Sequence, residues 1–313
     1  MLHRFNHFRS RCRLRTFRSL TMDVDVVKTK FRIGVVQMTS TDDRDRNYNI
    51  CSGLANIAKS EKVEFLCFPE CFHFIGGGDS GLKSTDIAEP IENSPSLAKY
   101  QELAKETQCS LSLGGFQEKS DDENKVYNTH VIIDRNGNII ETYRKIHLFD
   151  YKEGGLVESN FTLPGNEVKM VKSDSINIGL STCYDLRFPE LYQALRQMNS
   201  KIMLVPSAFT TKTGKAHWHS LLQARAIETQ SFVVAAAQAG YHHAKRRSYG
   251  HSLVVDPWGS VIAEAETNDS EDVMNETNEQ LLVVDLDLDL VETIRRKMPV
   301  MEHKRYDVFG NKE

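Results

Sequence analysis

The sequence predicts an α/β fold with sheets of mixed strand direction, arranged as one domain. Short β-branched runs alternate with longer amphipathic segments from Phe31 onward, which is typical of layered α/β folds. Two hairpin signals interrupt this alternation, and hairpins place antiparallel neighbours in a sheet. No internal repeat and no Pro- or Gly-rich linker divides the chain. We therefore expect a single domain over residues 30–310.

Strands and helices are expected to alternate through the first half of the chain. Runs of β-branched and aromatic residues predict strands, and apolar residues at helical spacing predict helices. Ser94 is expected to cap the second helix, because its side chain can accept a hydrogen bond from an unpaired backbone N–H. The expected elements are a strand at 31–38, a helix at 46–62, a strand at 63–70, a helix at 94–108 and a strand at 110–116.

Two hairpins are expected further along the chain. In the hairpin at 129–145, Asn136-Gly137 supplies two positive-φ residues for a tight turn. The hairpin at 251–265 is expected to turn at Asp256-Pro257-Trp258-Gly259. Between and after them we expect strands within 176–185, 202–209, 231–238 and 281–290, and helices at 189–200 and 216–230.

Composition and charge exclude two classes of protein. The 313 residues are 40% hydrophobic and 26% charged, with a net charge of -4. A chain without a basic surplus cannot neutralise many phosphates, so we expect no nucleic-acid partner. No apolar run approaches the roughly 20 residues that span a bilayer, so we expect no membrane partner. The expected partner is a small molecule or another protein.

The first 22 residues differ in composition from the rest. They contain six arginines, and no acidic residue precedes Asp23. This composition predicts a mitochondrial transit peptide, with a disordered basic leader as the alternative. Translation could also start at Met22. We therefore expect mitochondrial and cytoplasmic forms of the protein.

Several motifs that could bind a cofactor or a metal ion are weak evidence for such a site. GGGDSG at 76–81 matches a dinucleotide fingerprint, but no amphipathic helix follows it, so we expect a loop. Cys67 and Cys71 could form a redox or metal pair, or be buried structural thiols. His217 and His219 lie two apart on a predicted helix and therefore point to different sides. We expect no metal ion and no cofactor.

Three ionisable side chains follow apolar runs where strands are predicted to end. Taken singly, Glu70 could be a salt-bridged turn residue, Lys145 a surface lysine and Cys183 an inert thiol. Together they supply a base, a cation and a nucleophile. A thiol attacks poorly at neutral pH until a base removes its proton. Lysine and the backbone N–H of Tyr184 could stabilise the oxyanion of an attacked carbonyl, so the set predicts acyl transfer to water.

The segments around these residues resemble a known superfamily. FPECF, YRKIHLFD and STCYDLRFPE are similar to the three signature segments of the nitrilase (carbon-nitrogen hydrolase) superfamily. The resemblance runs from about residue 31 to about 310. It implies that Glu70, Lys145 and Cys183 are catalytic and that Glu158 holds the lysine and the attacking water. It also implies a four-layer αββα sandwich that forms a homodimer or higher homo-oligomer and needs no cofactor.

A narrower resemblance concerns the substrate. Segments 206–240 and 242–259 are similar to the deaminated glutathione amidases within that superfamily. This implies cleavage of deaminated glutathione to 2-oxoglutarate and cysteinylglycine. Phe209 and Thr213 match positions that line the substrate pocket in that group. The basic loop KRRSYGH could meet the glycine carboxylate of the substrate or stay solvated.

Arg187 lies four residues after the candidate nucleophile. Its guanidinium is suited to bind the 2-oxo acid carboxylate with two parallel hydrogen bonds. Pairing with Asp185 or Glu190 is the alternative. Two other functions stay open: an ω-amidase that releases ammonia from 2-oxoglutaramate, and a catalytically idle interaction partner on the same scaffold.

Overall fold

We describe the protein from a computed structural model, which describes residues 29–267 and 279–309. The expected leader, residues 1–22, lies outside the described residues. Among the described residues, no helix combines the length and apolar character needed to cross a membrane.

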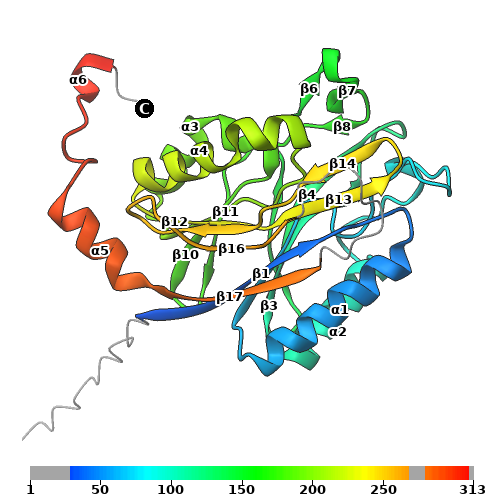
Figure 1. Cartoon of the computed structure of the whole chain (residues 1–313), viewed down its shortest axis with the longest axis horizontal. Coiled ribbons are helices and arrows are strands. Elements are labelled where there is room, and N and C mark those ends of the chain that lie inside the picture. Colours follow the sequence, from blue (N-terminus) through cyan, green and yellow to red (C-terminus); the bar gives the residue numbers. More distant parts are fainter. Residues whose placement is uncertain (1–28, 268–278, 310–313) are drawn as a thin grey trace, which may run out of the picture.

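Two β-sheets pack face to face, and helices cover the outer face of each (Figure 1). Within the described residues the larger sheet has nine strands and the smaller has six. Both sheets mix parallel and antiparallel neighbours, because β1 pairs parallel with β2 and antiparallel with β17, and β10 does so with β11 and β9. The expected mixed sheets and four-layer αββα sandwich are confirmed.

The larger sheet runs in the order β14-β13-β1-β2-β3-β4-β5, with β17 also paired to β1 and β8 to β4. Its strands are β1 (Lys30–Met38), β2 (Phe65–Phe68), β3 (Ser110–Lys119), β4 (Val126–Ile133), β5 (Ile139–Arg144), β8 (Thr162–Leu163), β13 (Ala237–His243), β14 (Arg246–Tyr249) and β17 (Gln280–Asp287).

The smaller sheet runs in the order β16-β15-β12-β11-β10-β9. Its strands are β9 (Met170–Ser173), β10 (Ile176–Leu180), β11 (Ile202–Leu204), β12 (Phe232–Ala235), β15 (Leu253–Val255) and β16 (Val261–Glu264). A separate short pair, β6 (Asp150–Tyr151) and β7 (Leu156–Val157), projects from the fold.

Helices α1 and α2 cover the larger sheet, and α3 and α4 cover the smaller one (Figure 1). The helices are α1 (Arg44–Ser60), α2 (Pro95–Thr107), α3 (Pro189–Gln197), α4 (Thr211–Thr229), α5 (Leu288–Lys297) and α6 (Tyr306–Phe309). Short 3₁₀ turns are η1 (Ser84–Asp86), η2 (Lys152–Gly154), η3 (Glu158–Asn160) and η4 (Cys183–Arg187). As expected, the Ser94 hydroxyl caps α2 by accepting a hydrogen bond from the Leu97 N–H.

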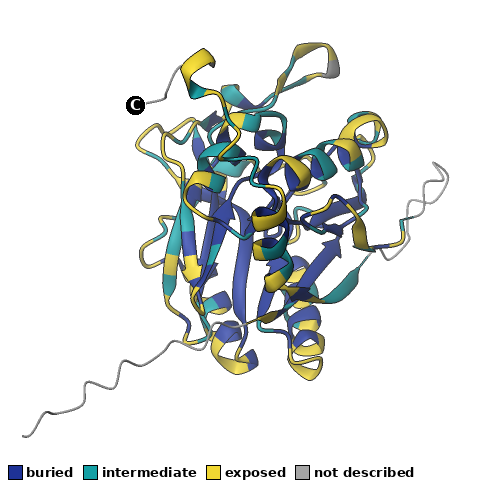
Figure 2. Cartoon of the chain, turned by 90° about the vertical axis from the view of Figure 1, so that its left-hand side faces the viewer, coloured by how far each residue is buried: buried dark blue, intermediate teal, exposed yellow. Residues whose placement is uncertain are grey.

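Side chains of one strand serve two cores, because successive residues of a strand point to opposite faces. Phe65 and Cys67 of β2 pack between the two sheets, whereas Leu66 and Phe68 pack under α1 and α2. Figure 2 shows the resulting pattern, with buried strands inside and helices exposed along one side. Both faces of the central strands are therefore buried, which explains their nearly continuous apolar sequences.

Some boundaries differ from the sequence prediction. The 129–145 hairpin turns over Asp134 to Asn138, and of Asn136 and Gly137 only Gly137 has positive φ. The Asp134 carboxylate accepts the N–H groups of Asn136 and Asn138, which stabilises this longer turn. Helix α4 begins at Thr211, five residues before the expected start, with the Thr210 hydroxyl as its cap.

The run predicted as one strand at 231–238 is two strands in different sheets. Its first part forms β12 of the smaller sheet, and Ala237 opens β13 of the larger sheet. The chain therefore crosses between the layers near Ala236. This crossing brings the β13–β14 hairpin to the same region as the end of β10.

Candidate active site

Four of the predicted site residues come from four different segments. Glu70 follows β2, Lys145 follows β5, Glu158 opens η3 and Cys183 opens η4 just after β10. All four are buried, with exposed fractions of 4%, 2%, 7% and 9% in the same order. A surface role for Lys145 is thereby excluded.

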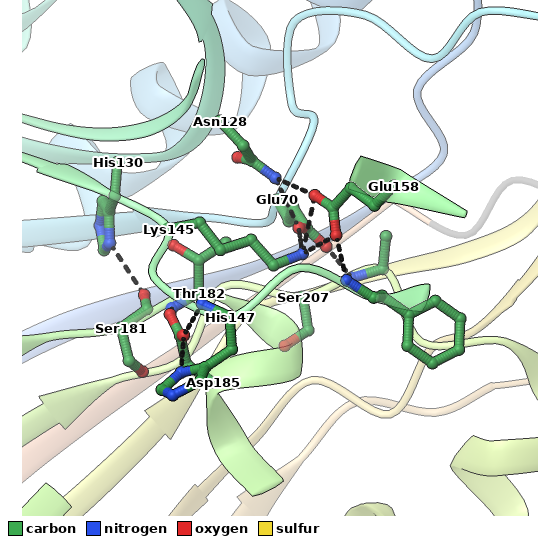
Figure 3. Close-up of polar contacts among 12 residues, drawn as sticks. Glu70, Asn128, His130, Lys145, His147, Glu158, Ser181, Thr182, Asp185 and Ser207 are labelled. Atoms are coloured by element: carbon green, nitrogen blue, oxygen red, sulfur yellow. Dashed lines mark hydrogen bonds and ion pairs between the residues drawn. The ribbon is translucent and has the colours of Figure 1, made fainter. Parts of the chain in front are cut away.

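Lys145 lies between the two glutamates (Figure 3). Its Nζ is 3.0 Å from Glu70 Oε1 and 2.8 Å from Glu158 Oε2. A buried ammonium is costly unless it is paired, and here two carboxylates share it. The pairing holds the lysine tip at a fixed place beside Glu70.

Further groups hold the two carboxylates. Asn128 Nδ2 donates to Glu70 Oε1 at 2.9 Å and to Glu158 Oε1 at 3.3 Å. The backbone N–H of Ala208 donates to Glu70 Oε2 at 3.0 Å, and that of Phe149 to Glu158 Oε2 at 2.7 Å. Sequence reasoning missed Asn128. A signal was available, because Asn128 and His130 are polar residues two apart on an apolar strand and so share one face.

A glycine makes room for this arrangement. The register of β3 and β4 shifts between Leu113 and Phe116, and Gly115 in this bulge has a φ of +77°. A Cβ on Gly115 would lie 2.7 Å from Asn128 Oδ1 and 2.9 Å from Glu70 Cγ. The Gly-Gly pair in the strand was the sequence signal for the bulge.

The turn that carries Cys183, which we call the nucleophile turn (η4, Cys183–Arg187), is stabilised by one buried carboxylate. Asp185 is fully buried, and its Oδ2 accepts from the Thr182 N–H at 2.9 Å and from the Tyr143 hydroxyl at 2.7 Å. Its Oδ1 accepts from the His147 N–H at 3.0 Å and lies 2.7 Å from His147 Nδ1 (Figure 3). Asp185 is thus committed to the turn.

Cys183 itself adopts a left-handed backbone conformation, with φ +48°. Such a conformation is strained for a non-glycine residue and persists only when its surroundings impose it. The Cys183 N–H donates to Pro206 O at 2.9 Å, which fixes the start of the turn. Tyr184 is the second residue of η4, and the first N–H groups of a helical turn have no partner within it. The N–H of Tyr184 is therefore suited to donate a hydrogen bond to an oxyanion.

The charges of the site are coupled. Burial and the Glu70 charge raise the pKa of the Cys183 thiol well above its usual value, against the opposing effect of Lys145. Burial opposes ionisation of Glu70, but Lys145 and hydrogen bonds from Cys183 and Asn128 hold the pKa of Glu70 below its usual value. Burial also opposes the charged form of Lys145, but Glu158 and Glu70 raise its pKa well above the usual value. The resting site holds a neutral thiol, an ionised Glu70 and a charged lysine.

These directions predict a broad pH optimum. Loss of activity in acid requires protonation of Glu70, which occurs below the usual value of 4.5. Loss in alkali requires deprotonation of Lys145, above the usual value of 10.5. We expect kcat/KM for an amide substrate to stay level between about pH 5 and about pH 9. A rise of kcat/KM through about pH 8.5 would instead indicate a thiolate that must form before attack.

Cys183 lies where two cavities meet. The inner one has a volume of about 100 Å³ and is lined by the catalytic candidates together with Asn128 and Phe149. The outer one has a volume of about 640 Å³ and is lined by Cys183 and Tyr184. Five cationic residues of three segments also line the outer cavity, namely Arg187, Lys212, Lys245, Arg246 and Arg247.

The remaining predicted residues lie around the outer cavity. Arg187, Phe209 and Thr213 all line it. The Arg187 guanidinium lies 5.6 Å from the centre of the Phe209 ring, and its Nη1 is 3.2 Å from His217 Nδ1. Among the described residues Arg187 forms no ion pair, so the alternative pairing with Asp185 or Glu190 is not found. Arg187 is available to an anionic ligand.

Comparisons with known proteins agree with this geometry. The family model described as carbon-nitrogen hydrolase matches residues 32–296. The chain is 47% identical to a deaminated glutathione amidase from Dictyostelium discoideum, over 89% of this chain and 95% of that protein. It is 42% identical to a deaminated glutathione amidase from Homo sapiens, over 89% of this chain and 84% of that protein. The crystal structure of the C. elegans NitFhit protein superposes with a TM-score of 0.79 at 41% identity, covering 90% of this chain and 66% of that one.

Proposed function

The chain belongs to the carbon-nitrogen hydrolase family, and from that premise we propose that it is an amidase that cleaves deaminated glutathione to 2-oxoglutarate and cysteinylglycine. This proposal rests on the residues that line the outer cavity. It offers five cations, and no Asp or Glu is among its described lining residues. Its volume of about 640 Å³ falls within the range of pockets that enclose drug-sized ligands.

The charge pattern favours a substrate with two carboxylates. Deaminated glutathione carries one on its 2-oxo acid end and one on its glycine end. Arg187 lies on the nucleophile turn, whereas Lys245, Arg246 and Arg247 lie on the β13–β14 hairpin. In this proposal Arg187 binds the 2-oxo acid carboxylate and the hairpin binds the glycine carboxylate. The substrate 2-oxoglutaramate has only the first carboxylate and leaves the hairpin without a ligand.

The geometry supports a two-step mechanism. The Cys183 sulfur attacks the amide carbon while Glu70 takes the thiol proton and passes it to the departing amine. Lys145 and the Tyr184 N–H stabilise the oxyanion, and Glu158 keeps Lys145 in place. Cysteinylglycine leaves, and a 2-oxoglutaryl thioester remains on Cys183. Glu70 then activates a water molecule, which hydrolyses the thioester and restores the thiol.

The test compares three substrates: deaminated glutathione, its C-terminal amide and 2-oxoglutaramate. We expect kcat/KM to be highest for deaminated glutathione. Losing the glycine carboxylate removes a charge-assisted contact, and we expect this to lower kcat/KM about 10- to 100-fold. A higher kcat/KM for 2-oxoglutaramate would assign the protein to the ω-amidases instead.

A substitution of Arg246 tests which residue binds the glycine carboxylate of the substrate. Arg246→Gln should lower kcat/KM for deaminated glutathione about tenfold more than for its C-terminal amide. Lys172→Gln serves as the matched control, because Lys172 is exposed on β9 and lines neither active-site cavity. Equal losses with both substrates would show that Arg246 does not bind the glycine carboxylate.

We also propose that the protein forms a homodimer. Four apolar side chains near the C-terminal end of α4 and the β15–β16 turn are exposed, namely Ile227, Trp258, Val261 and Ile262. Trp258 is 63% exposed and precedes Gly259, which lies against Ile227, so exposed apolar residues of the turn and of α4 come from adjoining segments, as is typical of protein interfaces. We expect sedimentation to give a dimer for the wild type and a monomer for Trp258→Glu. A monomeric wild type would contradict the proposal.

Dual localisation remains a proposal that rests on the composition of residues 1–22. It holds that a form starting at Met1 enters mitochondria and a form starting at Met22 stays in the cytoplasm. N-terminal sequencing of the protein from each cell fraction tests it. A single start and a single N-terminus in both fractions would contradict it.

A further inference from the structure

Two histidines and a glutamate from three elements meet outside the catalytic cavities. His219 lies on α4, Glu264 ends β16 and His251 lies in the connection between β14 and β15. Glu264 Oε1 is 2.9 Å from His219 Nε2 and 2.8 Å from His251 Nδ1. Within the described residues, this is the one group of three such side chains whose ligand atoms all lie within 4.8 Å of one another. None of the three lines either active-site cavity.

The backbone of His251 is fixed independently of its ring. Its φ is +59°, a left-handed conformation that few non-glycine residues adopt. Its N–H donates to Thr267 Oγ1 at 3.0 Å, and its carbonyl accepts from Trp218 Nε1 at 2.8 Å. The ring also packs on Tyr249, with ring centroids 4.4 Å apart. The fold therefore constrains the position of the His251 ring in addition to the contact of its Nδ1 with Glu264.

The charge of the group suits a divalent cation. Imidazoles bind metal ions in their neutral form, so a bound ion would have a ligand set of net charge -1 from the two histidines and Glu264, and in the described part of the chain Glu264 forms no ion pair with lysine or arginine. The side chains of His219 and Glu264 are 35% and 33% exposed, so an ion can enter and water can complete its coordination. Imidazole and carboxylate are ligands that zinc accepts at about 2.0–2.2 Å.

The two separations that involve Glu264 require only small adjustment. Tetrahedral zinc with bonds of that length holds its ligand atoms about 3.3 Å apart. The two short separations must therefore widen by about half an ångström. Glu264 and His219 are partly exposed and can move by that amount, whereas His251 is the fixed point.

We propose that His219, His251 and Glu264 form a binding site for a divalent transition-metal cation, with Zn²⁺ as the expected ion. The ion joins α4 to the β15–β16 hairpin. The N-cap Thr210 and the first turn of α4, including Thr213, line the outer cavity, so the ion stabilises the frame of the substrate site and takes no part in the chemistry. Sequence reasoning compared His219 only with His217 on the same helix and missed its partners His251, which precedes β15, and Glu264 on β16.

The test measures metal binding directly in a Cys183→Ala background, in which the catalytic thiol cannot act as a ligand. Protein treated with EDTA and dialysed is titrated with Zn²⁺ by calorimetry and with Co²⁺ by visible absorption. We expect one ion per chain and a Co²⁺ spectrum without a thiolate charge-transfer band. Bound Zn²⁺ should also raise the thermal midpoint, because it binds the folded state alone.

Matched variants assign the ligands. His219→Gln and Glu264→Gln should each weaken Zn²⁺ binding at least about 100-fold, beyond the loss that follows removal of an outer-shell partner. His217→Gln on the same helix and Glu266→Gln, two residues after β16 ends, should bind like the parent. Absence of saturable binding would overturn the proposal, as would equal affinity in all four variants or a thiolate band with Co²⁺. In those cases Glu264 acts only as a hydrogen-bond acceptor for two histidines.

Discussion

Replacing Cys183 with alanine is expected to lower amide hydrolysis by at least about 10⁴-fold while leaving the protein folded. The loss follows because the mechanism routes both steps through a bond to the Cys183 sulfur, and loss of a covalent nucleophile typically costs this much. Removing one sulfur atom from a buried position costs about 1 kcal/mol or less of unfolding free energy. Turnover is measured by release of 2-oxoglutarate, and stability by urea unfolding.

The matched control is Cys51→Ala. Cys51 is a fully buried thiol on α1 that contacts Met38, and it lies in the core beneath α1 and α2. This variant removes the same atom type and should keep the kcat of the wild type. A Cys183→Ala protein that retained more than a few per cent of wild-type activity would contradict the covalent mechanism.

Mass spectrometry distinguishes an active enzyme from a catalytically idle interaction partner. Wild type mixed with deaminated glutathione and quenched in acid should carry a 2-oxoglutaryl adduct on Cys183. Cys183→Ala should carry none. A wild type that neither turns over nor forms an adduct would favour the catalytically idle interaction partner.

The sequence predicted those site residues that lie in local patterns. Glu70, Lys145 and Cys183 each follow an apolar run, so strand ends could be recognised one segment at a time. The resemblance then supplied Glu158, which no local pattern distinguishes. In the structure, hydrogen bonds between residues 13 to 75 positions apart join Lys145 to Glu70 and Glu158, and Cys183 lines the same cavity. Their roles in catalysis stay predictions.

The supporting residues were harder to predict because their partners are distant in sequence. Asp185 was noticed beside Cys183, but only as a possible partner of Arg187. Its contacts with Tyr143 and His147 span 42 and 38 positions, and no periodic pattern indicates such a pairing. For the fold, the sequence predicted the types of most main elements, but it placed residues 288–290 in a strand where α5 begins and predicted no helix there. It missed the change of sheet near Ala236, because a buried apolar run looks the same whether it continues in one sheet or crosses to another.

Replacing Lys145 with methionine is expected to affect both activity and stability. Methionine has a similar length but no charge, so the oxyanion loses one of its two donors. We expect kcat to fall about 10²- to 10³-fold. The variant also leaves Glu70 and Glu158 buried side by side without their shared cation. Breaking a buried ion pair by removing one partner typically costs about 3–5 kcal/mol of unfolding free energy.

The pH dependence of this stability loss identifies its cause. In the wild type the pKa of Glu70 lies below its usual value of 4.5, so its ionised form stabilises the fold above that pH. Without Lys145, burial is no longer opposed, and the pKa of a buried carboxyl rises above its unfolded value. Such a group destabilises the fold at neutral pH, and the penalty shrinks as pH falls and the group takes up a proton. We therefore expect the stability gap between Lys145→Met and wild type to narrow between pH 7 and about pH 5.

A double variant completes the test. Lys145→Met with Glu158→Gln leaves one buried carboxylate instead of two, and should regain part of the lost stability at pH 7 but none of the lost activity. Lys169→Met is the matched control, because Lys169 pairs with Glu167 at the surface and exposed pairs contribute about 0–1 kcal/mol. A stability gap that is independent of pH, or unchanged in the double variant, would mean that Lys145 acts through packing and not through its charge. The charge of Lys145 would then be needed for catalysis alone.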